Sequence, residues 1–355
     1  MKLRVGVIGA GRIGQIAHLQ HFAADARCTV VALADLRPDL ARSVAGKFGV
    51  AKVYGHHAAL LADPEVDAVV VITHRYHTAA VVRDALMAGK HVLSEKPMAF
   101  DAETARALAA LAARQGLVYA VGYMKRHDPW VALARRAMAT ELGAARLIRI
   151  HCFVGEPDRT DSFVMTQESR PPGDLAAAAP SWLPAGLRSC YDRFLNVYSH
   201  DLDLALFLGG DDLRLAYATR FGDDGHHIVL RNEALTVTID CAALPGRAWR
   251  EGFEAVCAHG VISVRLPWPL DPDAQGDVTV EGRGQLPLAP GEDVWAFKAQ
   301  AADFVSAVLS GAAPGSAASS AVRTLECTAE IFERYSHDLA AGAAQSLQGE
   351  KHVAH

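Results

Sequence analysis

The sequence predicts an α/β protein with two domains, a doubly wound parallel sheet followed by a second α/β domain built on a large, open, mostly antiparallel sheet. Strand-like and helical segments alternate up to about residue 121, which is typical of βαβ units. The strands are nearly all apolar, as expected for a sheet covered on both faces. The length of 355 residues exceeds one ordinary core. We therefore expect domains at 1–122 and 123–341, with a loose tail at 342–355.

Composition excludes several classes of protein. Hydrophobic residues make up 51% of the chain and charged residues 21%, which indicates a folded, soluble protein. A net charge of −5 without a long basic run argues against nucleic acid or an anionic membrane as the main partner. The 6 cysteines form no CxxC pair, so they suggest thiols in a reducing compartment. Because no apolar stretch is long enough to span a bilayer, we expect a cytoplasmic location.

A glycine-rich turn follows the first predicted strand, Leu3 to Ile8, and leads into a helix near 12–24. Strand, glycine turn and helix follow each other in this order at dinucleotide sites. Gly9 would allow the tight turn, Gly11 would let the backbone approach a pyrophosphate, and Gly14 would let the helix pack closely on the strand. The helix N-terminus would attract the phosphates. The expected cofactor contacts from this turn are Gly9, Gly11, Arg12, Ile13 and Gly14.

The second predicted strand, Thr29 to Ala34, ends at Asp35, at the spacing of about twenty residues expected for a carboxylate that binds the adenosine ribose. This favours NAD. Arg37 could instead meet a 2′-phosphate, so NADP stays open. Alternatively, Asp35 caps the helix or turn that begins near Pro38.

The remaining strands of the first sheet are expected at Ala68 to Ile72, His91 to Leu93 and Val118 to Val121, with helices near 38–49, 77–89 and 101–116. Ligands of open α/β sheets bind at the carboxyl ends of the strands. The residues that follow these strands are therefore candidates for cofactor contact. They are Thr73, His74, His77, Glu95 and Lys96, although His77 begins a helix and could be structural.

Lys96 is the candidate acid/base. The following proline restricts its backbone to extended conformations. A lysine partly desolvated beside a positive nicotinamide ring would have a pKa lowered toward neutrality, and it could remove an alcohol proton while hydride leaves the same carbon. The alternative is a surface lysine in a turn.

Past residue 122 the pattern changes. We expect a helix at Pro129 to Thr140 and a strand at Ala145 to Val154, followed by an irregular segment at 155–190. An amphipathic helix is expected at Tyr191 to Leu208, and short strands over 212–282. Two helices, near 292–310 and 317–341, should follow, joined by a flexible linker at 311–320. Irregular segments as long as 155–190 usually serve as lids or binding loops.

These motifs together resemble the Gfo/Idh/MocA oxidoreductase family. The resemblance rests on the glycine turn, on Asp35, on GKHVLSEKPMA from Gly89 to Ala99, and on Asn196 and His200 in the second domain. It implies a Rossmann domain followed by an α/β domain that forms dimer or tetramer contacts. It also implies NAD(H) or NADP(H), a sugar, cyclitol or related polyol substrate, and Lys96 as the catalytic residue.

The chain departs from the family pattern Asp-x-x-x-His, because Asn196 stands at the first position and His200 at the second. Both side chains would share one helix face. Asparagine cannot ionise, so it would only orient a hydroxyl. Proton transfer then falls to Lys96 alone or to His200 near its natural pKa, unless His200 is a core or capping residue. Further expected substrate contacts are Tyr123, Arg126, Tyr191 and Arg193, and Arg126 equally suits an ion pair between the domains.

The leading hypothesis is an NAD(P)-dependent oxidoreductase that acts on a secondary alcohol or ketone of a sugar, amino sugar or cyclitol. The alternative is a regulator on the same fold that senses cofactor or sugar without turnover, which Asn196 favours slightly. Expected partners are a small polyol and further copies of the chain, as a homodimer or homotetramer formed through the second-domain sheet. No metal site is expected, because the side chains of the pairs His56-His57 and His226-His227 would diverge.

Overall fold

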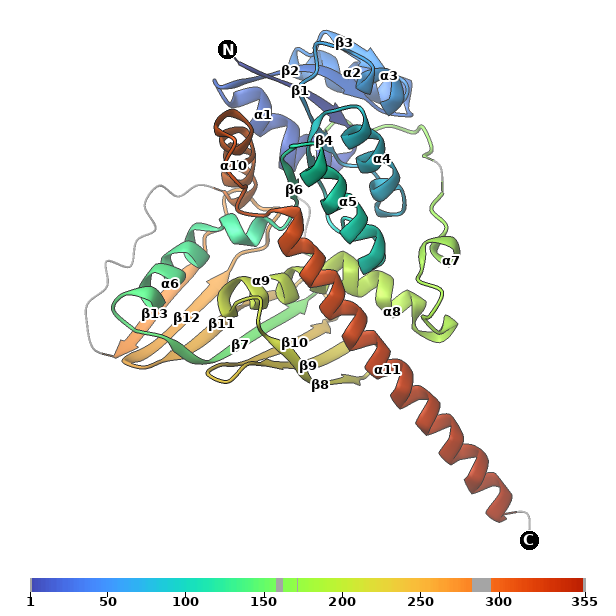
Figure 1. Cartoon of the computed structure of the whole chain (residues 1–355), viewed down its shortest axis with the longest axis vertical. Coiled ribbons are helices and arrows are strands. Elements are labelled where there is room, and N and C mark those ends of the chain that lie inside the picture. The colour runs from blue at the N-terminus through green and yellow to red at the C-terminus, as the bar shows by residue number, and fades with distance from the viewer. Residues whose placement is uncertain (1, 158–161, 171, 283–294, 354–355) are drawn as a thin grey trace.

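The computed structural model describes residues 2–157, 162–170, 172–282 and 295–353. Each of two sheets organises one part of the chain, and helices connect and cover them (Figure 1). Residues 292–294, where the sequence predicts the start of a helix, lie outside the described ranges.

The first sheet has six parallel strands in the order β3-β2-β1-β4-β5-β6. The strands are β1 (Leu3–Ile8), β2 (Cys28–Ala34), β3 (Lys52–Tyr54), β4 (Ala68–Val71), β5 (His91–Ser94) and β6 (Tyr119–Val121). All four residues of β4, AVVV, are buried, as the prediction of a sheet covered on both faces requires. The order confirms the doubly wound arrangement. The sequence pattern missed β3 because this strand is only three residues long and none of its residues is buried.

Helices α1 (Gln20–Ala24), α2 (Pro38–Phe48), α3 (His57–Leu61), α4 (Arg75–Met87) and α5 (Ala102–Arg114) connect these strands. The side chain of Asp101 accepts a hydrogen bond from the Thr104 N–H at 2.7 Å and so caps α5. The helix expected after the glycine turn is different in kind, because its first part is a π-helical turn, Gly14–Leu19. Gln15 in this turn is buried and bonds to the Ala10 carbonyl at 2.9 Å.

The second sheet has seven strands in the order β13-β12-β11-β7-β10-β9-β8. They are β7 (Ala145–Val154), β8 (Arg214–Phe221), β9 (Gly225–Arg231), β10 (Thr236–Ala243), β11 (Trp249–Cys257), β12 (Gly260–Leu266) and β13 (Asp277–Gly282). Strands β7 and β10 are parallel, and the other described pairings are antiparallel. The predicted mostly antiparallel sheet is confirmed.

Helices α6 (Pro129–Ala139), α9 (Ser199–Gly209) and α11 (Ala318–Val353) lie along one face of this sheet (Figure 1). Alternate residues of β7, among them Ile148 and Ile150, are buried under these helices. The intervening residues point to the other face, where Arg149 is exposed and Leu147, His151 and Phe153 are half-buried. None of the described helices covers this face of the second sheet.

The chain between β7 and α9 passes along the first domain before it returns to the second (Figure 1). It contains α7 (Leu175–Ala178) and α8 (Arg188–Arg193), followed by a π-helical turn at Phe194–Tyr198. The helix expected at Tyr191 to Leu208 is thus three consecutive pieces. The π turn carries Asn196.

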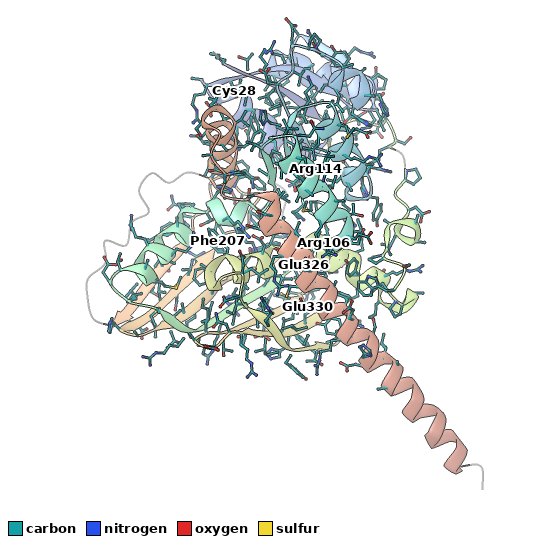
Figure 2. All side chains as sticks on the ribbon, viewed as in Figure 1. Cys28, Arg106, Arg114, Phe207, Glu326 and Glu330 are labelled. Carbon is teal, nitrogen blue, oxygen red and sulfur yellow. The ribbon has the colours of Figure 1, made fainter. Side chains whose placement is uncertain are left out.

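The C-terminal helices correct two expectations. Between α10 (Ala296–Ser310) and α11, Ser316 accepts a backbone hydrogen bond from Val121 at 2.9 Å, so the expected flexible linker is partly bound to the edge of the first sheet. Helix α11 continues to Val353, where a loose tail was expected from residue 342. Arg106 on α5 and Glu326 on α11 form an ion pair at 2.7 Å that joins the domains (Figure 2).

Candidate active site

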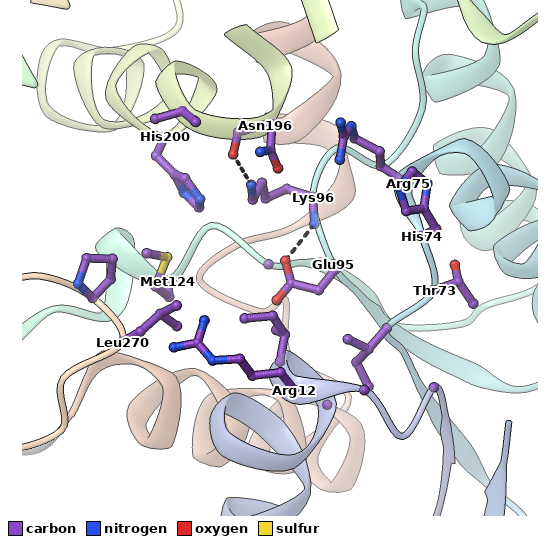
Figure 3. A pocket seen from close by; sticks show the side chains of 18 of the residues that line it. Arg12, Thr73, His74, Arg75, Glu95, Lys96, Met124, Asn196, His200 and Leu270 are labelled. Atoms are coloured by element: carbon purple, nitrogen blue, oxygen red, sulfur yellow. Dashed lines mark hydrogen bonds between the residues drawn. The ribbon is translucent and has the colours of Figure 1, made fainter. Parts of the chain in front are cut away.

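A cavity of about 1270 Å³ lies between the carboxyl ends of the first sheet and the second domain. One end is lined by the glycine turn and Asp35, the middle by Glu95 and Lys96, and the far end by His200 and Trp249. Figure 3 shows that side chains from both domains meet around Lys96. The cavity occupies the position at which open α/β sheets bind their ligands.

The glycine turn has the shape that a dinucleotide requires. Gly9 has a φ of 110°, and a Cβ there would lie 2.2 Å from the Ile72 carbonyl oxygen. A Cβ at Gly14 would lie 2.3 Å from the Gly9 carbonyl oxygen, so the helix could not pack this closely with any other residue. At Gly11 a Cβ would meet only the Arg37 guanidinium at 3.7 Å, and the backbone there faces the cavity. These residues fit a bound pyrophosphate.

Asp35 lies at the end of β2, as predicted, and is almost fully buried. Its carboxylate accepts hydrogen bonds from the Ala10 N–H at 2.8 Å and from Nε and Nη2 of Arg37 at 2.8 and 2.9 Å. Burial raises the pKa of Asp35, but the hydrogen bonds from Arg37 and Ala10 lower it by more than burial raises it. The net shift of the pKa is therefore downward. Asp35 is therefore a charged acceptor, and its charge is balanced by Arg37.

Lys96 follows β5 and points across the cavity, where its Nζ donates a hydrogen bond to the main-chain oxygen of Asn196 (Figure 3). Burial lowers its pKa to about 8, while Glu95 opposes this shift and Arg75 and Lys125 add to it. The amine is thus close to half neutral at slightly alkaline pH, as an acid/base requires.

Glu95 lines the cavity beside Lys96. One carboxylate oxygen is 2.7 Å from Nε2 of His18, and the other accepts from the Lys96 backbone N–H at 3.2 Å. Burial raises the pKa of Glu95, but His18 and Lys96 lower it more, so the net direction is downward. The Glu95 carboxylate stays charged, and its charge partly offsets the lowering of the Lys96 pKa by burial.

His200 lines the cavity opposite Glu95, and its Nδ1 has no hydrogen-bond partner among the described residues. Burial, followed by the charges of Lys96 and Lys125, lowers the pKa of His200 well below its usual value. The imidazole is therefore neutral at pH 7, and of the two alternatives for proton transfer this favours Lys96 over His200. The ring of Tyr123 packs edge-on against it, with centroids 5.7 Å apart.

Three residues expected to bind substrate do not line the cavity. Arg126 makes a two-pronged ion pair with Asp203 at 2.7 Å, and both side chains are buried. Tyr191 is fully buried and donates to the Phe100 carbonyl at 2.5 Å. Tyr123 is buried behind His200. These side chains are bonded or packed within the protein, which favours structural roles for them over substrate contact.

The other expected contacts do line the cavity. Asn196 lines the cavity beside Lys96, and Arg193 lines it as well, although its guanidinium is paired with Asp224. The remaining members of this group, on the first domain, are Arg12, Ile13, Thr73, His74 and His77.

A buried charge cluster, which the sequence analysis did not assign, lies at the second-domain end. Lys125 Nζ is 3.0 Å from Asp201 and forms a second ion pair with Glu251. Cys152, Asp201 and Glu251 offer ligand atoms within 4.8 Å of one another, but the Lys125 ammonium supplies a cation at this place. Glu251 could have been noticed as an acid within the strand WREGFEAVC, although its partners come from distant segments.

The model of the oxidoreductase family with an NAD-binding Rossmann fold, Gfo/Idh/MocA, matches residues 3–123. An inositol 2-dehydrogenase from Burkholderia lata is 37% identical over 171 residues, 45% of this chain and 50% of that protein. A UDP-N-acetylglucosamine 3-dehydrogenase from Acidithiobacillus ferrooxidans is 33% identical over 208 residues, 59% of this chain and 55% of that protein. The chain thus matches about half the length of these curated relatives.

A solved structure is similar over nearly the whole chain. It is a 3-ketoreductase from Actinomadura kijaniata in complex with NADP and TDP-benzene, with a TM-score of 0.71 and 25% identity, covering 93% of this chain and 97% of that one. Both domains therefore share their arrangement with this protein. Of the helices described here, none combines the length and the apolar character that crossing a membrane demands.

Proposed function

Because the chain belongs to the Gfo/Idh/MocA oxidoreductase family, we propose that it transfers a hydride between NAD(P) and a secondary alcohol or ketone carbon of a sugar, amino sugar or cyclitol. The observation that carries this proposal is the position of Lys96. Its amine, with a pKa of about 8, stands in the cavity between the glycine turn and His200. A proton acceptor is thereby placed next to the cofactor site.

Each residue then has a separate task. Bound NAD(P) supplies the hydride acceptor in oxidation and the hydride donor in reduction. Neutral Lys96 accepts the hydroxyl proton in oxidation, and its ammonium returns a proton to the carbonyl oxygen in reduction. The Asn196 carbonyl holds the Lys96 amine in place. Neutral His200, which lines the cavity, can form a hydrogen bond with a neighbouring substrate hydroxyl.

The substrate class is supported by the lining and by the relatives. Hydrogen-bonding side chains from both domains, including Lys96, Asn196 and His200, line the cavity. Several relatives are named for the oxidation or reduction of ring hydroxyl positions, among them an inositol 2-dehydrogenase and a UDP-N-acetylglucosamine 3-dehydrogenase. A polyol ring would use such convergent polar groups.

The test is absorbance at the reduced-nicotinamide band while purified protein is mixed with NAD or NADP and with sugars, amino sugars or cyclitols. We expect one compound class to produce reduced cofactor, and the matching ketones to consume it. Asn196 in place of an acid favours a second candidate, a sensor that binds cofactor without turnover. Saturable NADH binding together with no redox change for any compound would support the sensor instead.

We also propose that the chain assembles through the uncovered face of the second sheet. A homodimer or homotetramer formed through this face would bury Arg149 and its neighbour Glu254, whose charged groups are 3.6 Å apart. Light scattering coupled to size-exclusion chromatography should give at least twice the chain mass of 37.9 kDa. A mass of one chain at micromolar concentration would contradict this assembly.

A further inference from the structure

The segment 162–170, called here the bridging segment, lies on the first domain although it belongs to the chain between β7 and α7. At Val164, the Gln15 side chain accepts a hydrogen bond from the backbone N–H at 2.8 Å and donates one to the carbonyl at 3.0 Å. Four residues later, Glu168 reaches the beginning of α2. The bridging segment is therefore bound at two points beside the dinucleotide cavity.

Glu168 takes the place of a helix cap. Its carboxylate accepts hydrogen bonds from the backbone N–H groups of Asp39 at 3.2 Å and Leu40 at 2.9 Å. The residue in the N-cap position, Arg37, makes no side-chain cap bond. The free N–H groups and the dipole at a helix N-terminus attract an anion. Here that anion is a carboxylate brought from another part of the chain.

The turn between β2 and α2 is also where the adenosine ribose is recognised in dinucleotide sites. Asp35 and Arg37 from this turn line the cavity, and Asp35 is the carboxylate placed to bind ribose hydroxyls. A 2′-phosphate needs a free cation and free N–H donors at this turn. Arg37 is already paired with Asp35, and Glu168 occupies the two N–H groups at the start of α2.

The charges add to this effect. The Glu168 carboxylate accepts from the two N–H groups at the start of α2 and from the Thr166 hydroxyl at 3.2 Å, and it forms no ion pair among the described residues, since nearby Arg42 is paired with Asp39. A 2′-phosphate carries further negative charge into this place, whereas a ribose hydroxyl carries none. Repulsion by Glu168 therefore weakens the binding of NADP and leaves the binding of NAD unaffected.

We propose that Glu168 is a specificity-determining residue, which selects NAD over NADP by holding the anion position at the start of α2. The inference rests on the proposed function, because it concerns the cofactor of that reaction. It adds a residue from outside the glycine turn and outside β2 to the recognition of the adenosine ribose. It also explains why Arg37, although well placed, does not by itself make the site suitable for NADP.

The experiment measures the dissociation constants of NADH and NADPH from nicotinamide fluorescence, with the full chain and no substrate. Wild-type protein should bind NADH more tightly. Glu168→Gln should tighten NADPH binding at least about fivefold, because one repulsive charge is removed. Glu168→Ala should tighten it further, because it frees both N–H groups. NADH should stay within about twofold in each variant.

Asp39→Asn is the matched control, since it removes a charge at the same helix start from a carboxylate that is exposed and paired with Arg42. Its effect on NADPH should be below about twofold at 0.15 M salt. The proposal is overturned if wild-type protein prefers NADPH, if both Glu168 variants keep the wild-type ratio of the two constants, or if Asp39→Asn matches Glu168→Gln. Absence of binding of either cofactor to wild-type protein would instead defeat the proposed function.

Discussion

The Nζ of Lys96 donates a hydrogen bond to the main-chain carbonyl of Asn196, and this contact links the two domains at the centre of the cavity. Lys96 follows β5 of the first sheet, whereas Asn196 lies in the π-helical turn Phe194–Tyr198. A π turn displaces the regular hydrogen bonds of a helix and is frequent at functional sites. The amine is thus oriented by backbone, which leaves the Asn196 side chain free to contact a substrate.

Lys96→Ala should lower turnover by about two to four orders of magnitude, because general acid-base catalysis contributes that much. The dissociation constant of NADH should change little, since the glycine turn and Asp35 are untouched. Steady-state kinetics and nicotinamide fluorescence measure the two effects separately. Lys298→Ala, an exposed lysine on α10, is the control and should behave as wild type. Full activity of Lys96→Ala would remove Lys96 from the mechanism.

The rate of alcohol oxidation should rise with pH around a midpoint of about 8, the lowered pKa of Lys96. Oxidation needs the neutral amine, which is the major form above that pKa, whereas ketone reduction needs the ammonium and should fall over the same range. His200 contributes no midpoint near pH 6.5, because its pKa is shifted well below that value. Profiles of kcat/KM in both directions test this; parallel rather than opposed profiles would contradict it.

Arg126→Met should destabilise the protein by about 3 to 5 kcal/mol, because it leaves the buried carboxylate of Asp203 without its partner. Urea unfolding monitored by circular dichroism measures this loss. At a temperature where the variant is folded, KM should stay near the wild-type value, since Arg126 does not line the cavity. Arg126→Met combined with Asp203→Leu should recover part of the stability. A large rise in KM without a loss of stability would instead indicate that Arg126 contacts the substrate.

Local sequence patterns predict well where the first-domain residues of the cavity lie. The turn at Gly9, the carboxylate of Asp35 and the lysine before Pro97 each depend on a few neighbouring residues, and each lies where the pattern places it. The same holds for strands such as Leu3–Ile8, because burial on both sheet faces imposes a continuous apolar run.

The second-domain half is less predictable, because it depends on contacts between distant segments. Spacing alone does not reveal that Arg126 pairs with Asp203, 77 residues away, or that Glu251 on β11 pairs with Lys125. The linker expectation failed for a similar reason, since the small residues before α11 pair with the backbone of β6. Loose structure was expected from residue 342, whereas α11 continues to Val353.

Asn196→Asp should raise the midpoint of the oxidation pH profile by roughly one unit, because a carboxylate close to Lys96 favours the ammonium form. Asn196→Ala keeps the main-chain carbonyl that binds Lys96, so its midpoint should stay near the wild-type value while KM rises. Comparison of the two variants separates the charge of the side chain from its contact with substrate. An unchanged midpoint in Asn196→Asp would mean that the side chain at this position points away from the amine. A raised midpoint in Asn196→Ala would mean that the side chain, in addition to the backbone, holds Lys96 in its neutral form.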